Sequence, residues 1–204
     1  MIGLEKGKDG LWLITIDRAH KANALTREML NELADLAETA QEARVLVLTG
    51  AGNVFSAGMD LEAAKSGLPT DPVWERLSAA IAALPGLTIA ALNGTVAGGA
   101  IGMVLACDLR LAVAGTNVFY PVMKLGFLPQ PSDPARLTRL VGPSRAKLIL
   151  MAGEKVDTKT ALNWGLFDRV VERDVLIDEA RLMAKDTLAA TPDHAAGIKA
   201  LFES

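Results

Sequence analysis

The amino-acid sequence predicts an α/β fold built from stacked turns of strand and helix. Three short apolar strands each end in glycine, at residues 46–50, 89–94 and 110–115, and a turn and a helix follow two of them. This loose structural repeat suits a superhelix of stacked turns better than a doubly wound sheet. No linker, low-complexity tract or shift in composition divides the 204 residues, so we expect a single domain over residues 1–204.

Helices are predicted where apolar residues recur at helical spacing. In residues 26–42 one face is formed by Met29, Leu30, Leu33, Leu36 and Ala37, and Thr26 can cap the amino terminus. The other predicted helices cover residues 73–84, 144–151, 158–164 and 175–190. Pro85 and Gly86 would end the helix of residues 73–84. Several of these apolar faces predict only packing against a core.

The composition is typical of a soluble enzyme domain. Half of the residues (50%) are apolar and 4% are aromatic, and the net charge of -3 comes from scattered rather than clustered charges. This gives no reason to expect nucleic acid or a membrane as partner. Residues 1–10 lack the apolar core of a secretory signal and no apolar stretch is long enough to span a bilayer, so we expect a cytoplasmic protein. Cys107, the single cysteine, predicts a buried small hydrophobe.

Two glycine-rich turns carry the chemistry that the sequence predicts. Residues 93–102, NGTVAGGAIG, follow the strand of residues 87–92 and lead into an apolar helix. Residues 50–61 follow the strand of residues 44–49 in the same way. Glycine lets a ligand approach the main chain, and the first N–H groups of a helix have no partner inside it. One N–H from each turn could therefore form an oxyanion hole for an enolate or a tetrahedral adduct.

Two other roles for these turns have to be weighed. Glycine turns between strand and helix often bind nucleotide phosphates, but the dinucleotide fingerprint G-x-G-x-x-G is incomplete in both places. Phe55 stands where the first turn would need its third glycine, and Ala97 where the second would need its first. Close packing of helix against strand would explain one such turn but not two within one pattern.

The order and separation of the two turns resemble those of the crotonase superfamily, also called the enoyl-CoA hydratase/isomerase superfamily. Further segments that match are residues 21–25, 121–126, 136–142, 161–166, 170–171 and 198–199, so the resemblance covers nearly the whole chain. It implies a crotonase-like superhelix of stacked strand-strand-helix turns with carboxy-terminal helices, here shortened. It also implies that the backbone N–H groups of Met59 and Gly99 stabilise a thioester enolate, and that the protein is a homo-oligomer, a trimer or a dimer of trimers.

The same resemblance implies how CoA would bind. CoA would enter as part of the thioester substrate, with no permanently bound cofactor. Lys21, Ala22 and Ala24 lie in the early segment that contacts CoA, and Ala57 lies in the first oxyanion segment. Lys199 matches a lysine of the terminal helix that reaches CoA, often on a neighbouring subunit. Both lysines would act as point-charge partners for phosphate, although an exposed lysine is often only solvated.

The two carboxylates with which the family hydrates enoyl thioesters have no counterpart in this chain. Carried over by position, the first falls on Gly102, on the helix after the second turn, and the second falls on Val122, just after a proline on the following strand. Neither residue can orient water or move a proton. The proton carrier is therefore unidentified.

Other carboxylates near the expected site favour structural roles. Asp133 is the nearest to a further catalytic loop of the family, which falls on Gln130, but Asp followed by Pro134 favours a helix N-cap over a proton carrier. Asp60 and Glu62 follow the first turn, where acids commonly complement a helix dipole.

The remaining polar candidates give no separate site. Tyr120 could donate a hydrogen bond to a carboxylate or an oxyanion, and we expect it to line a pocket wall. His20 and His194 have no ligand-type neighbour at suitable spacing, so no metal site is predicted. No set of Ser, His and Asp marks a hydrolase triad.

The sequence thus predicts an acyl-CoA thioester enzyme of the enoyl-CoA hydratase/isomerase type. Two alternatives stay open. A non-catalytic acyl-CoA-binding protein could have kept the fold and lost the acids. An acyl-CoA decarboxylase would need less acid–base help, because loss of carbon dioxide generates the enolate directly.

Overall fold

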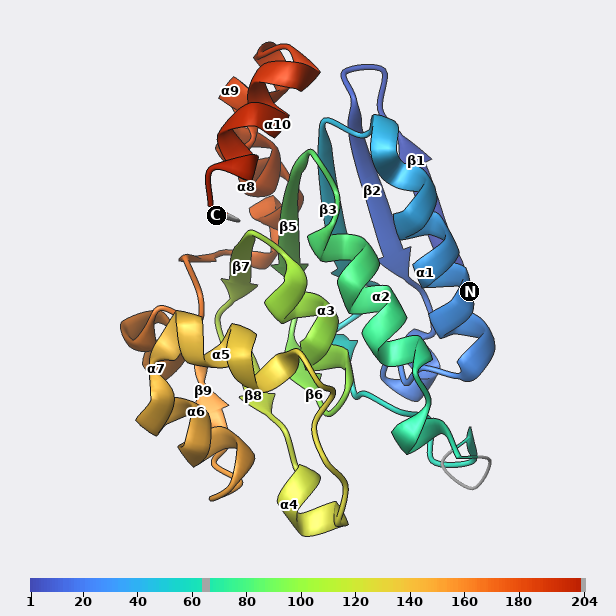
Figure 1. The fold of residues 1–204 in the computed structure, drawn as a ribbon, viewed down its shortest axis with the longest axis vertical. Coiled ribbons are helices and arrows are strands. Elements are labelled where there is room, and N and C mark those ends of the chain that lie inside the picture. The colour runs from blue at the N-terminus through green and yellow to red at the C-terminus, as the bar shows by residue number, and fades with distance from the viewer. Residues whose placement is uncertain (64–66, 203–204) are drawn as a thin grey trace.

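The computed structural model describes residues 1–63 and 67–202, and in that part the chain forms two sheets with helices around them (Figure 1). The larger sheet has the strand order β1-β2-β3-β5-β7-β10. Its strands are β1 (Ile2–Lys6), β2 (Leu11–Ile16), β3 (Val45–Gly50), β5 (Leu87–Leu92), β7 (Leu109–Val113) and β10 (Arg169–Val171). The smaller sheet has the order β4-β6-β8-β9 and contains β4 (Val54–Ser56), β6 (Thr95–Ala97), β8 (Asn117–Phe119) and β9 (Val156–Asp157).

Strands of the two sheets alternate along the chain. β3 is followed by β4, β5 by β6, and β7 by β8, with the helices α2 (Val73–Ala82) and α3 (Ala100–Ala106) after the first two pairs. β3, β5 and β7 are parallel neighbours in the larger sheet, and β4, β6 and β8 are parallel neighbours in the smaller one. The predicted superhelix of strand-strand-helix turns is confirmed. Because successive turns stack, the glycine turns that follow β3 and β5 come to lie side by side.

The larger sheet is covered on both faces. Along β3, Leu46 and Leu48 belong to the core under α1 (Arg27–Thr39) and α2, whereas Val45 and Val47 belong to the core under α8 (Leu176–Met183). Neighbouring residues of a strand point to opposite faces. A strand buried on both faces is apolar at every position, which explains why β3 lacks the alternation of a half-exposed strand.

Most predicted helices are present with small changes of boundary. Thr26 caps α1 and accepts a hydrogen bond from the N–H of Met29 at 3.4 Å. The final predicted residues of that helix form the 3-10 turn η2 (Ala40–Glu42) instead. The predicted helix of residues 175–190 is interrupted at Ala184, which separates α8 from α9 (Lys185–Ala189). The other helices are α5 (Asp133–Val141), α6 (Pro143–Leu150), α7 (Thr158–Trp164) and α10 (Pro192–Ala200).

The expectation that Val122 lies on a strand is wrong. β8 already ends at Phe119, and Val122 begins the short helix α4 (Val122–Leu125). Pro121 holds the N-cap position of this helix, and Gly126, with φ of 74°, ends it in the left-handed conformation. Proline at a helix start and glycine at its end are the residues that stop a strand from continuing here. Across the described part of the chain, no helix has both the length and the apolar character needed to traverse a membrane.

Candidate active site

The two glycine turns meet at one cavity of about 150 Å³. Met59 lines it from the first turn and Gly99 from the second. The turns touch through Gly58, where a Cβ atom would lie 2.6 Å from the carbonyl oxygen of Ala97. Gly58 also has φ of 87°, so both its conformation and its contact require glycine. Contact between the turns therefore brings the two predicted oxyanion donors to the same cavity.

A hydrogen bond from Leu25 to the preceding carbonyl determines the direction of the Met59 N–H. The N–H of Leu25 donates to the carbonyl of Gly58 at 2.7 Å, and the carbonyl of Leu25 accepts from Asp60 at 2.9 Å. The Gly58 carbonyl and the Met59 N–H belong to one trans peptide, in which these groups point in opposite directions. Because the carbonyl faces Leu25, the N–H of Met59 faces away from Leu25.

Gly99 lies at the N-cap position of α3, where N–H groups lack partners inside the helix. A Cβ atom at Gly99 would lie 3.0 Å from the ring of Trp74, so the close approach of this ring favours glycine. In the described part of the chain, neither the Met59 N–H nor the Gly99 N–H donates to a protein acceptor. Both donors remain available to a ligand.

Asn23 holds the early loop, residues 21–25, against the first glycine turn, residues 50–61. It is fully buried and has φ of 54°, a left-handed conformation that asparagine tolerates. Its Nδ2 donates to the carbonyls of Ala51 at 2.9 Å and Val54 at 2.7 Å, and its Oδ1 accepts from the N–H of Arg18 at 2.8 Å. Sequence reasoning placed Asn23 in the matching segment without giving it a role. An asparagine between apolar alanines was the available signal.

Four of the five residues predicted to contact CoA lie together. The N–H of Ala57 donates to the carbonyl of Ala22 at 2.9 Å, and Ala57 also lines the cavity. Ala24 is two residues further along the same loop, and Lys21 is exposed at the end of the 3-10 turn η1 (Ala19–Lys21). The loop therefore lies against the first glycine turn.

Lys199 is not brought to this site within one chain. Its Nζ donates to the carbonyl of Gly86 at 2.9 Å and to Asp108 at 2.8 Å. Gly86 and Asp108 precede β5 and β7, so Lys199 lies where these parallel strands begin, whereas the glycine turns follow strand ends. In Figure 1, α10 lies at the end of the molecule opposite α4.

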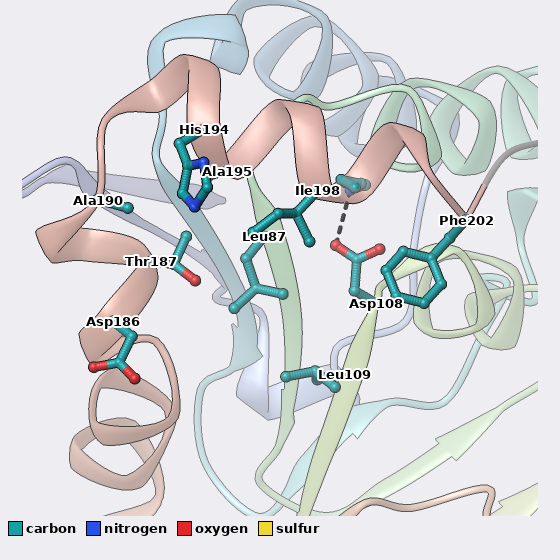
Figure 2. A pocket seen from close by; sticks show the side chains of 11 residues that line it. Leu87, Asp108, Leu109, Asp186, Thr187, Ala190, His194, Ala195, Ile198 and Phe202 are labelled. Atoms are coloured by element: carbon teal, nitrogen blue, oxygen red, sulfur yellow. Dashed lines mark hydrogen bonds and ion pairs between the residues drawn. The ribbon is translucent and has the colours of Figure 1, made fainter.

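A larger cavity of about 710 Å³ lies beside Lys199. Figure 2 shows Leu87, Ile198 and Phe202 around it, with Asp108 held by the hydrogen bond drawn. Neither glycine turn contributes to its wall. Size alone would select this cavity, but the unpaired N–H groups select the smaller one as the candidate active site.

Asp133 is not a helix N-cap, so the predicted cap is wrong. α5 begins at Asp133 itself, Ser132 holds the N-cap position, and no side chain caps the helix. The N–H of Asp133 already closes a turn onto the carbonyl of Gln130 at 3.1 Å, which starts the helix one residue early. The carboxyl group instead accepts a hydrogen bond from the hydroxyl of Tyr120 at 2.9 Å.

Asp133 and Tyr120 form a buried pair at the edge of the cavity. Asp133 is 0% exposed, and Tyr120, which lines the cavity, is 4% exposed. Burial raises the pKa of Asp133 to about 7, against the opposing hydrogen bond from Tyr120 and the charge of Arg136. Burial also raises the pKa of Tyr120 well above its usual range. The expectation that Tyr120 lines a pocket wall is confirmed, and its hydroxyl has a carboxyl partner as well.

The two positions that lack carboxylates also lie close to this pair. Val122 lines the cavity at the start of α4. Gly102 lies on α3, where a Cβ atom would be 2.9 Å from Oδ1 of Asp133. The space beside Gly102 is thus taken by the carboxyl group of another helix.

Apolar side chains that sequence reasoning did not single out form most of the cavity wall: Leu61, Pro69, Trp74, Phe119, Pro121, Leu125, Phe127 and Leu128. Trp74 belongs to a helix whose apolar face predicted only a core. Leu128 is 87% exposed, and this exposure could not be seen from composition. Apolar residues clustered around Gly126 were the signal for a binding surface.

Two other predicted roles fit the structure. Asp60 forms an ion pair with Arg18 at 2.6 Å and accepts hydrogen bonds from the N–H groups of Glu62 and Ala63, so its role is structural. The hydrogen bond from Arg18 holds the pKa of Asp60 below its usual range. Burial raises the pKa of Cys107 to about 12, which keeps it a thiol. No group of three or more His, Cys, Asp or Glu within residues 1–63 and 67–202 could hold a metal ion.

Comparison with known proteins identifies the family of the chain. A family described as Enoyl-CoA hydratase/isomerase matches residues 6–204. The chain is 33% identical to carnitinyl-CoA dehydratase from Citrobacter koseri, covering 94% of this chain and 76% of the relative. It is 35% identical to the putative enoyl-CoA hydratase/isomerase YngF from Bacillus subtilis, covering 88% and 73%. The crystal structure of an enoyl-CoA hydratase from Bacillus anthracis superposes with a TM-score of 0.92 at 27% identity, covering 100% of this chain and 82% of that one. The chain therefore belongs to the enoyl-CoA hydratase/isomerase family, the crotonase superfamily, and is an acyl-CoA enzyme of that family.

Proposed function

We propose that this protein binds an acyl-CoA thioester with the thioester oxygen between the N–H groups of Met59 and Gly99, and stabilises the enolate that forms there. One observation carries the proposal. Two backbone donors from different turns lack protein acceptors and border one largely apolar cavity. Donors fixed by the fold need no reorganisation when charge develops on the oxygen, which is the main source of their catalytic effect.

The surroundings of the donors favour an oxyanion over a neutral ligand group. Trp74 and Phe127 belong to the wall of the cavity and keep its dielectric constant low. The start of α3 adds the positive end of a helix dipole at Gly99. Removing one such donor typically costs about 2.7 to 4 kcal/mol of transition-state stabilisation.

The CoA part of the substrate would lie along the early loop. Ala22 and Ala24 offer main chain beside Ala57, and Lys21 is exposed there to meet a phosphate. In this arrangement the thioester enters from the loop and the acyl group reaches the apolar wall.

The test combines binding with isotope exchange. Titration calorimetry with acetyl-CoA and crotonyl-CoA should give heat, whereas acetate, crotonate and NAD should give none. Incubation of the bound thioester in deuterium oxide, followed by mass spectrometry, should then show deuterium at the α carbon. A folded protein that binds no thioester would overturn the proposal.

The same measurements separate the alternatives. Thioester binding without α-deuterium would identify a binding protein. Release of carbon dioxide from a malonyl-type thioester, with no exchange into acetyl-CoA, would identify a decarboxylase. Either result would replace the enolate-forming reaction that starts from an α C–H bond.

A further inference from the structure

The buried pair of Tyr120 and Asp133 connects the cavity to a carboxyl group on the neighbouring helix α5. Tyr120 lines the cavity and donates its hydroxyl hydrogen to Oδ2 of Asp133 at 2.9 Å. The other oxygen, Oδ1, is buried and has no hydrogen-bond partner. The carboxyl group caps no helix and forms no ion pair among the described residues.

A buried carboxyl oxygen without a partner is destabilising, commonly by about 1 to 3 kcal/mol. Such groups are rare in folded proteins and often mark sites where chemistry occurs. Helix α3 leaves space for the carboxyl group of Asp133, because Gly102 has no side chain. A Cβ atom at Gly102 would lie 2.9 Å from Oδ1 of Asp133. The fold therefore keeps an unfavourable group at the edge of the cavity.

The charges around Asp133 leave it able to gain or lose a proton near neutral pH. Arg136, on the same helix, favours the ionised carboxylate, whereas Glu75 of α2 disfavours it. Glu75 is held close by the N–H of Ser132, which donates to its Oε2 at 3.2 Å. Tyr120 is the titratable group that faces Asp133 from the cavity side. A group that titrates near the working pH is the most effective general base.

We propose that Tyr120 and Asp133 together carry the proton in the enolate-forming step, with Tyr120 contacting the thioester and Asp133 holding the proton behind it. This inference rests on the proposed function. The C–H bond at the α carbon breaks and its proton passes to the phenol oxygen of Tyr120, as the phenol proton passes to Asp133. The electron pair of the C–H bond becomes the enolate, whose oxygen accepts hydrogen bonds from Met59 and Gly99. Return of the proton by the same route completes exchange, so no other reactant is needed.

A purely structural pair would have the same geometry, so the test must measure proton transfer. We expect exchange of the α hydrogen of acetyl-CoA in deuterium oxide to rise with pH and level off above about pH 7, as Asp133 ionises. Tyr120→Phe and Asp133→Asn should each slow exchange at least about a hundredfold, with little change in the Kd for acetyl-CoA. Asp157→Asn is the matched control, since Asp157 caps α7 far along the chain and should leave exchange unchanged.

A second pair of variants tests the position of the carboxyl group without changing its chemistry. Gly102→Ala places a methyl group against Oδ1 and should displace Asp133, lowering the exchange rate more than tenfold. Gly197→Ala, on α10 with no neighbouring atom within 4 Å, is the matched control. Both proteins should remain folded by circular dichroism.

The outcomes distinguish the inference from the function on which it depends. If the wild-type protein exchanges and both Tyr120→Phe and Asp133→Asn exchange equally fast, the pair is structural and the inference is wrong. If Asp133→Asn loses both the exchange of the α hydrogen and the rise of the exchange rate with pH, the inference is supported. If the wild-type protein binds acetyl-CoA but never exchanges its α hydrogen, enolate formation from the α C–H bond fails, and the inference that depends on it is wrong.

Discussion

The two cavities lie at opposite ends of the larger sheet, and they differ in what meets at them: an ion pair at one and the two glycine turns at the other. Beside Lys199 the cavity is large, but its lysine and Asp108 already bind each other. Between Met59 and Gly99 the cavity is small, yet its wall holds two N–H groups without protein acceptors. The two N–H groups, and not the volume, are what favour the smaller cavity as the candidate active site.

Removing one of the two N–H donors, that of Gly99, tests this difference most directly. Gly99→Pro has no N–H at this position and should slow α-hydrogen exchange about a hundredfold to a thousandfold. Gly99→Ala keeps the N–H but adds a Cβ atom 3.0 Å from the ring of Trp74. It therefore measures the packing cost alone. Equal loss in the two variants would show that packing, and not the donor, accounts for the effect.

The buried carboxyl group gives a prediction about stability that is independent of activity. Asp133 has a folded-state pKa near 7 against 3.8 for the ordinary group, so the folded protein binds the proton more tightly than the unfolded chain. Its contribution to stability therefore falls as pH rises from about 4 to about 7. Asp133→Asn should remove this loss, and its stability relative to wild type should increase by about 2 to 3 kcal/mol between pH 5 and pH 8.

Chemical denaturation of both proteins at the two pH values measures this difference. A constant difference between the variant and the wild type would mean that Asp133 has an ordinary pKa. It would also remove the support that titration near neutral pH gives to the proton-carrier inference.

Asn23 tests whether the early loop belongs to the site. Asn23→Ala takes the side-chain partner from the Ala51 carbonyl and the Arg18 N–H, whereas the Val54 carbonyl keeps its hydrogen bond from Nδ2 of Asn93 at 3.2 Å. The variant should cost about 1 to 3 kcal/mol of stability. Because the loop is then less firmly held beside Ala57, the Kd for acetyl-CoA should rise. Asn117→Ala, which removes an exposed hydrogen bond to Gly115, is the control and should change neither quantity. An unchanged Kd in Asn23→Ala would separate the loop from substrate binding.

The smallest effect is expected at the opposite cavity. Lys199→Ala removes a partly exposed ion pair with Asp108 and should cost about 1 kcal/mol or less. Calorimetry should give the same Kd for acetyl-CoA as in the wild-type protein, whereas Lys21→Ala should weaken binding. A weaker Kd in Lys199→Ala would place this lysine at a CoA site of a neighbouring subunit.

The parts that the sequence predicts well are those set by local patterns. The cap of Thr26, the stripe on α1 and the bounds of α7 depend on residues a few positions apart. The short strands β6, β8 and β9 have two or three residues each, and they are strands only because distant segments pair with them. No local pattern announces such pairing.

In the candidate site too, features set by neighbouring residues could be predicted, whereas contacts between distant residues could not. The glycine turns at Met59 and Gly99 could be identified because strand, turn and helix follow one another directly. The local Asp-Pro signal predicts a cap at Asp133, whereas its partner Tyr120 is thirteen residues away and contacts it only in the fold. Lys199 was matched by position, and only the structure shows that Asp108 and the Gly86 carbonyl already bind it.

The peptide between Gly58 and Met59 links the direction of the Gly58 carbonyl to that of the Met59 N–H. A peptide unit is rigid and planar, so rotating its carbonyl rotates its N–H by the same angle. The hydrogen bond from Leu25 to that carbonyl therefore fixes the direction of the Met59 N–H as well. A movement of Leu25 that turns this carbonyl would therefore turn the Met59 N–H as well.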